Sequence, residues 1–171
     1  MHLPDTLIKI GTTAFEKCTN LFEINIPDSV EEIGDAAFSE SGIIEIKIGE
    51  GIEDFNDSVF YNCTKLKKVR VGNNFKQLGT ATFYNCTSLV DIEFPNSLEG
   101  IGDHAFYNCI SLKSLSLPNS LATVGYAAFF GCTNLKHLFI NNQGTNLTNS
   151  FLESEEKTTH FIEIYVPWNA P

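Results

Sequence analysis

The stretch Phe94-Pro95-Asn96-Ser97-Leu98-Glu99-Gly100-Ile101-Gly102-Asp103-His104-Ala105-Phe106-Tyr107-Asn108-Cys109 decides the fold, because similar stretches recur along the whole chain. Its second phenylalanine belongs to a series spaced by 22 or 23 residues: Phe15, Phe38, Phe60, Phe83, Phe106 and Phe129. Three positions after each comes a small residue, in the order Cys18, Ser41, Cys63, Cys86, Cys109 and Cys132. A fixed period of this length indicates a solenoid of stacked units.

Aliphatic residues recur at the same period between the phenylalanines. One column is Ile24, Ile46, Val69, Ile92, Leu115 and Leu138, and the next, two positions on, is Ile26, Ile48, Val71, Phe94, Leu117 and Ile140. A spacing of two is typical of a strand. A Pro or Gly that follows ends it, at Pro27, Gly49, Gly72, Pro95 and Pro118. We therefore predict one short strand per unit, paired with its neighbours in a parallel sheet.

A second column predicts how each unit turns. It holds Gly34, Asn56, Gly79, Gly102 and Gly125. Gly and Asn tolerate a left-handed backbone, so we expect the chain to turn in that conformation here. The segment from this column to the phenylalanine is too short for a regular helix. It predicts a single helical turn or an irregular return on the convex side.

The runs Ile26–Phe38 and Phe94–Cys109 resemble BspA-like leucine-rich repeats. The resemblance covers roughly residues 3–140, and a strand expected at 161–167 extends it. It implies a leucine-rich-repeat solenoid of the α/β horseshoe-like kind, mostly short parallel strands with short helical or irregular convex segments. It also implies a cell-surface or secreted protein of the adhesin type. Its expected partner is a protein, such as a host matrix or surface protein.

The repeats and the C-terminal part form two predicted regions. Residues 1–140 hold about six units and an N-terminal partial unit, and residues 141–171 hold an irregular repeat and cap. In the second region Leu147 fits the column of Val124, Phe151 or Leu152 fits the phenylalanine column, and Trp168 is expected to shield the open edge. Met1 is followed by His-Leu-Pro-Asp, which lacks the features of a signal peptide. The start in mid-repeat is what a piece of a longer protein would show.

Charge and hydropathy exclude several classes of partner. The net charge of -10 and the pI of about 4.7 argue against nucleic acid and anionic membrane surfaces, which select basic patches. No apolar run reaches the roughly 18–20 residues of a membrane span, so no membrane insertion is expected.

No residue pattern predicts catalysis, a cofactor or a metal. The cysteines share one column and lack the short spacing of a zinc site, so we expect buried, reduced thiols that fill space. His2, His104, His137 and His160 fall in different columns. There is no nucleophile elbow, phosphate loop or paired-carboxylate motif, and the chain is not expected to be an enzyme.

The variable strand positions are the best candidate for a binding surface, because they face the open concave side. The candidate partner-binding residues are Glu23, Glu45, Lys47, Lys67, Lys68, Arg70, Asp91, Glu93, His137 and Phe139. The cations form a band flanked by acidic residues on both sides. Two interpretations stay open. Alternating charges stabilise a sheet by about 0.2–1 kcal/mol per pair, or the band sets the specificity of a partner contact.

Other functions compete with protein binding. The repeats could serve as a structural spacer. An aromatic column on the convex side, Tyr61, Tyr84, Tyr107 and Phe130, could bind carbohydrate. The open ends of the stack make end-to-end or edge-mediated homo-association a further hypothesis.

Overall fold

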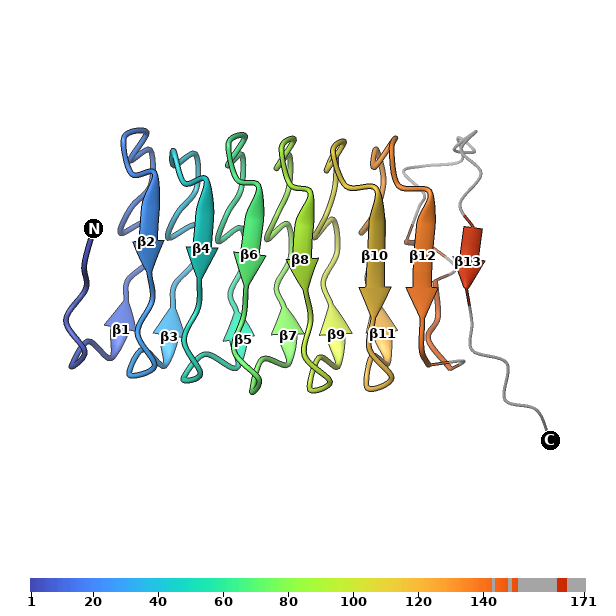
Figure 1. Ribbon diagram of the computed structural model, residues 1–171, viewed down its shortest axis with the longest axis horizontal. Helices are drawn as coiled ribbons and strands as arrows, with labels where there is room; N and C mark the ends of the chain where they lie inside the picture. The colour runs from blue at the N-terminus through green and yellow to red at the C-terminus, as the bar shows by residue number, and fades with distance from the viewer. Residues whose placement is uncertain (143, 148, 151–162, 166–171) are drawn as a thin grey trace.

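The computed structural model describes residues 1–142, 144–147, 149–150 and 163–165. Within them the chain forms a solenoid whose coils stand side by side in a row (Figure 1). The front strands of Figure 1 are β2 (Glu23–Asn25), β4 (Glu45–Lys47), β6 (Lys68–Arg70), β8 (Asp91–Glu93), β10 (Ser114–Leu117), β12 (His137–Ile140) and β13 (Glu163–Tyr165). The strands behind them are β1 (Lys9–Ile10), β3 (Glu32–Ile33), β5 (Asp54–Phe55), β7 (Gln77–Leu78), β9 (Gly100–Ile101) and β11 (Thr123–Val124).

The front strands pair in parallel, in the register that the repeat predicts. The order β2-β4-β6-β8 forms one sheet and β10-β12-β13 forms another. Ile46 lies opposite Ile24 on one side and opposite Val69 on the other, and Leu115 lies opposite Leu138. Residues of one sequence column therefore do lie on adjacent strands, which confirms the predicted stacking.

The return segment of each coil differs in detail from the expectation. We predicted one strand per coil with a helical or irregular return; the described residues contain no helix, and the return holds a second strand of two residues. The backbone of the return bonds both to the neighbouring coil and within its own short turns: the Phe60 N–H donates to the Thr82 carbonyl at 2.9 Å, and the Tyr61 N–H donates to the Ser58 carbonyl at 2.9 Å. Left-handed residues such as Ala81 and Asn85 also interrupt each return, and a right-handed helix does not accommodate them.

The glycine column has a role that we did not predict. We expected Gly34, Asn56, Gly79, Gly102 and Gly125 to be left-handed, but none of them has a positive φ. The left-handed residues lie two positions later, as at Ala36 and His104. Glycine is required instead by close approach, because a Cβ built on Gly102 would lie 2.7 Å from the Gly79 carbonyl carbon in the preceding coil.

The phenylalanine column forms a continuous file through the core, as predicted. From Phe38 to Phe129 the side chains are buried. Successive rings from Phe15 to Phe129 stack with centroids 5.1–5.6 Å apart and interplanar angles of at most 25°. Offset stacking of this kind adds stability to that gained from burying the rings.

The thiol column forms a second file. Cys63, Cys86, Cys109 and Cys132 are buried and free of disulfides, as expected. Their function as donors was not expected: the Cys86 thiol donates to the Phe60 carbonyl at 3.1 Å, and the other three make the corresponding bond over 3.0–3.2 Å. Burial raises the pKa of Cys63 to about 11 and that of Cys132 to about 12, so these thiols keep the donated proton at neutral pH.

Two details of the C-terminal prediction are confirmed: the strand expected within 161–167, and the place of Leu147. β13 pairs in parallel with β12, and Leu147 packs against the core. The expectations for Phe151, Leu152 and Trp168 lie outside the described residues.

Candidate functional site on the strand face

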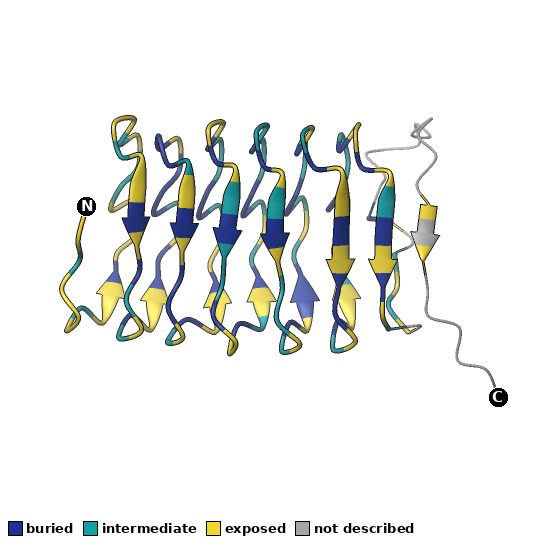
Figure 2. Cartoon of the chain, viewed as in Figure 1, coloured by how far each residue is buried: buried dark blue, intermediate teal, exposed yellow. Residues whose placement is uncertain are grey.

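The outward side of the front strands, called the strand face here, carries nine of the ten candidate residues, and Lys67 adjoins it. In the front strands β2, β4, β6 and β8 the middle residue is buried and its two neighbours are exposed or half-buried, an alternation that Figure 2 shows. Lys67 lies one residue before β6 and is exposed. The structure therefore brings the candidates onto one open surface, but it divides them into three parts with different surroundings.

The part formed by β6 and β8 pairs its charges internally. Arg70 Nη2 lies 2.6 Å from Asp91 Oδ2 and 3.5 Å from Glu93 Oε1, and Lys68 Nζ lies 3.5 Å from Asp91 Oδ2. The hydrogen bond from Arg70 lowers the pKa of Asp91, and Asp91 raises the pKa of Arg70. Here the sheet-stabilising interpretation applies, because opposite charges face each other across the strands.

The part formed by β2 and β4 does not pair its charges. Glu23 lies opposite Glu45, and Lys47 lies opposite Arg70, so like charges share a register. Within the described residues no ion pair forms at Glu23, Glu45 or Lys47. Like charges directly opposite each other destabilise a sheet. Glu45 also lies opposite Lys68, but the Lys68 ammonium lies beside Asp91. No ion pair among the described residues therefore supports the sheet-stabilising interpretation in this part.

A hollow lies over β4 in the same part of the face. Its lining, called the strand-face hollow below, is Glu23, Asn25, Glu45, Ile46, Lys47, Lys68 and Arg70. Its volume is about 120 Å³, well below the roughly 300–1,000 Å³ of small-molecule pockets. The hollow is suited to receive side chains of a partner rather than to enclose a metabolite.

The third part is aromatic and lies at the C-terminal end of the face. The Phe139 ring stacks on the Tyr165 ring with centroids 4.8 Å apart, and the two residues stay 40% and 44% exposed. His137 Nδ1 lies 3.3 Å from Glu163 Oε2. Our sequence reasoning missed Tyr165, although the echo of the strand pattern at 161–167 placed it in the column of Phe139.

The opposite side of the solenoid, formed by β3, β5, β7 and β9 with the loops beside them, is acidic. Its exposed carboxylates are Asp28, Glu31, Glu32, Asp35, Glu50, Glu53, Asp54, Asp57, Glu99 and Asp103. Two of its lysines form ion pairs, Lys9 with Glu32 and Lys76 with Glu53. Several acids are used structurally: the Asp57 carboxylate accepts from the Thr80 N–H of the next coil at 2.7 Å. Sequence reasoning missed this surface because it did not predict the second strand.

The convex aromatic column stacks on itself. The Tyr61 and Tyr84 rings are 4.9 Å apart at 13°, and the Tyr84 and Tyr107 rings are 4.5 Å apart at 7°. Phe130 continues the column 5.1 Å from Tyr107. Neighbouring rings thus cover the ring faces that a sugar would need, which weakens the carbohydrate hypothesis for this column.

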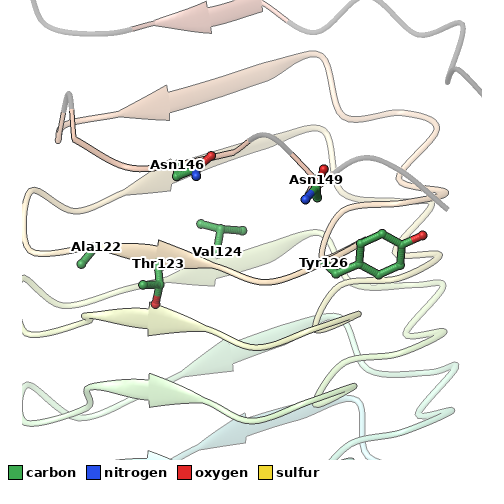
Figure 3. Close-up of a pocket in the computed structure, with 6 residues that line it drawn as sticks. All are labelled: Ala122, Thr123, Val124, Tyr126, Asn146 and Asn149. Atoms are coloured by element: carbon green, nitrogen blue, oxygen red, sulfur yellow. The ribbon is translucent and has the colours of Figure 1, made fainter. Parts of the chain in front are cut away.

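Other pockets lie in the described chain. One of about 470 Å³ is lined by Asp5, Asn25, Ile26, Pro27, Asp28, Ser29 and Lys47, so it adjoins the strand-face hollow at Asn25 and Lys47. A pocket beside β11 is lined by Ala122, Thr123, Val124, Tyr126, Asn146 and Asn149 (Figure 3). These six side chains lack a charged group. No group of three or more His, Cys, Asp or Glu among the described residues is placed to hold a metal ion. No helix in the described ranges is long and apolar enough to cross a membrane.

Comparison with known proteins identifies the repeat. The BspA type leucine rich repeat region matches in six copies, over residues 1–89 and 68–166. A search of curated protein sequences finds no match.

Solved structures of leucine-rich repeat proteins share the fold. A protein from Bacteroides ovatus is 27% identical with a TM-score of 0.75, covering 97% of this chain and 47% of its own. A leucine rich cell surface protein from Faecalibacterium prausnitzii is 25% identical with a TM-score of 0.66, covering 98% and 53%. The pneumococcal vaccine antigen PcpA, at 21% identity and a TM-score of 0.63, covers 94% and 54% and shares the fold. This chain spans about half the length of these three relatives, and it belongs to the BspA-type leucine-rich repeat family.

Proposed function

We propose that the chain is a protein-binding repeat module that contacts its partner through the strand face. The observation that carries this proposal is the like-charged, unpaired surface over β2 and β4 on an otherwise self-paired sheet. A surface that serves only stability would pair these charges. A charged surface on a rigid scaffold instead sets association rate and specificity.

The aromatic end of the face supports the same function. Phe139 and Tyr165 expose large rings that are already held by their mutual stacking. Aromatic residues are enriched among the residues that dominate binding energy at protein interfaces. The two parts lie on the same open side of the front strands, so one partner can contact both (Figure 1).

The location and the partner class are part of the proposal. One similar structure is named a cell surface protein and another a vaccine antigen. These names support a cell-surface or secreted protein of the adhesin type, with a host matrix or surface protein as its partner. No catalytic function is proposed.

A binding screen with matched variants tests the proposal. The chain would be passed over immobilised, purified extracellular-matrix and cell-surface proteins, with binding followed by surface plasmon resonance. Any ligand found should bind Lys67→Glu and Phe139→Ser more weakly. Glu31→Lys, an exposed change on the acidic side, should bind like the original chain. A ligand that loses affinity only for Glu31→Lys would overturn the choice of face, and absence of any ligand in the panel would count against the adhesin class.

A further inference from the structure

We propose that the strand-face hollow is a docking site for an extended polypeptide segment that carries a basic and an acidic side chain two residues apart. This inference rests on the proposed function and adds the chemistry of the partner. It follows from the arrangement of charges around β4 and from the spacing of side chains along a strand.

Most charges around the hollow are separated by sign; the exception is Lys68, which occupies the first outward position of β6 beside Glu45. The carboxylates of Glu23 and Glu45 occupy the first outward position of β2 and β4. The cations Lys47 and Arg70 occupy the second outward position of β4 and β6. The hollow therefore has an acidic end and a basic end, each built from two like charges in register.

Ion pairs within the described part of the chain neutralise neither these two carboxylates nor Lys47. Lys68, which lies opposite Glu45, places its ammonium 3.5 Å from Asp91 on the other side. Arg70 likewise turns Nη2 toward Asp91. The two cations of β6 near Glu45 thus place their charged groups beside Asp91, and Lys47 forms no ion pair among the described residues, so a partner with both signs could neutralise Glu45 and Lys47.

The spacing selects an extended segment. Glu45 and Lys47 flank the buried Ile46, so they point outward from the same strand. Alternate side chains of an extended chain lie on one face about 6.6–6.8 Å apart. A partner strand has that same spacing, so a basic residue can lie over Glu45 while an acidic residue two positions away lies over Lys47.

The other classes of ligand fit less well. A polyanion would meet Glu23 and Glu45, and a polycation would meet Lys47 and Arg70. The volume of about 120 Å³ holds side-chain ends but not a metabolite. Only a ligand with both signs at this separation satisfies both ends of the hollow.

Short peptides test the inference directly. The probe is acetyl-Thr-Lys-Val-Glu-Thr-amide, and its controls are the same peptide with Lys-Val-Lys, with Glu-Val-Glu, and with Lys and Glu adjacent. Binding is followed at low salt by the amide chemical shifts of the isotope-labelled chain. We expect saturable shifts at Glu45, Ile46 and Lys47 with the probe, and at least threefold weaker binding of each control.

Neutral variants distinguish a binding role from a structural one. Glu45→Gln and Lys47→Gln should each weaken probe binding roughly two- to fivefold, the range for an exposed ion pair. Their melting temperatures should be equal to that of the original chain or higher, because each removes a like-charge contact. Glu99→Gln and Lys113→Gln, exposed residues outside the hollow, should leave probe binding unchanged.

The outcomes separate this inference from the proposed function. Equal binding of the probe and its controls, shifts away from β4, or no binding at all would overturn the inference. If a protein ligand then still requires Lys67 or Phe139, the proposed function stands with another part of the face in use. If the peptide does not bind at β4 and no protein ligand requires Lys67 or Phe139, the strand face is not the binding surface.

Discussion

The interior of this solenoid repeats from coil to coil, whereas its strand face does not. In the interior, Phe83 stacks on Phe60 and Phe106, each of which has the same type of neighbour. On the strand face, one outward column changes from Lys68 to Asp91 in a single step. A buried position must fit a copy of itself about 4.8 Å away, so its residue type is constrained. An outward position contacts solvent or a partner, and it is free to carry specificity.

The largest expected effect is in the interior. Phe83→Ala removes a fully buried ring from the middle of the file, and it should lower the free energy of unfolding by about 3–5 kcal/mol. Urea unfolding measures it. Tyr84→Ala, the half-buried neighbour on the convex column, is the matched control and should cost less. Equal losses of unfolding free energy in the two variants would contradict the distinction between the buried phenylalanine file and the aromatic column beside it.

The thiol file should show a smaller effect that depends on the donor. Cys86→Ala leaves the Phe60 carbonyl without its donor and should cost about 1–3 kcal/mol. Cys86→Ser keeps a hydroxyl donor at the position and should retain more of the stability. If serine destabilises as much as alanine in thermal unfolding, the thiols serve only as fillers.

The self-paired half of the strand face should show a weaker, pH-dependent effect. A double-mutant cycle of Arg70→Gln and Asp91→Asn should give a coupling of about 0.2–1 kcal/mol, because both side chains are about a third exposed. The folded pKa of Asp91 is lowered. Its contribution is therefore present above the unfolded pKa near 4 and is lost as the pH falls through the folded pKa. A coupling that persists at pH 2 would contradict the ion pair.

The smallest effect is expected at the like-charged half. Glu45→Gln should change the free energy of unfolding by no more than about 0.5 kcal/mol, in the stabilising direction. The gain should shrink at 1 M salt, where screening acts over about 3 Å. Differential scanning calorimetry at low and high salt measures both. A clear destabilisation would show that Glu45 has a stabilising contact, and it would remove the contrast between the two halves of the face.

Sequence reasoning succeeded where a repeated residue type marks a repeated environment. The 23-residue period placed the phenylalanines and thiols in their files and nine of the ten candidate residues on one face. It failed for the return strand, because a two-residue strand such as Gln77–Leu78 is too short to show an alternating pattern. It also assigned Gly102 to a turn, because a sequence cannot distinguish a glycine needed for φ from one needed for close approach.

The sequence alone determined the period, the parallel stacking and the set of outward residues, because these depend on which side chains recur at fixed spacing. Only the tertiary structure decided which charges neutralise each other. Arg70 has Lys47 on one side and Glu93 on the other, and its guanidinium turns toward Asp91. That choice depends on side-chain geometry over a few ångströms, since Coulomb energy and hydrogen bonding both fall steeply with distance. It leaves Glu23, Glu45 and Lys47 without an ion pair among the described residues.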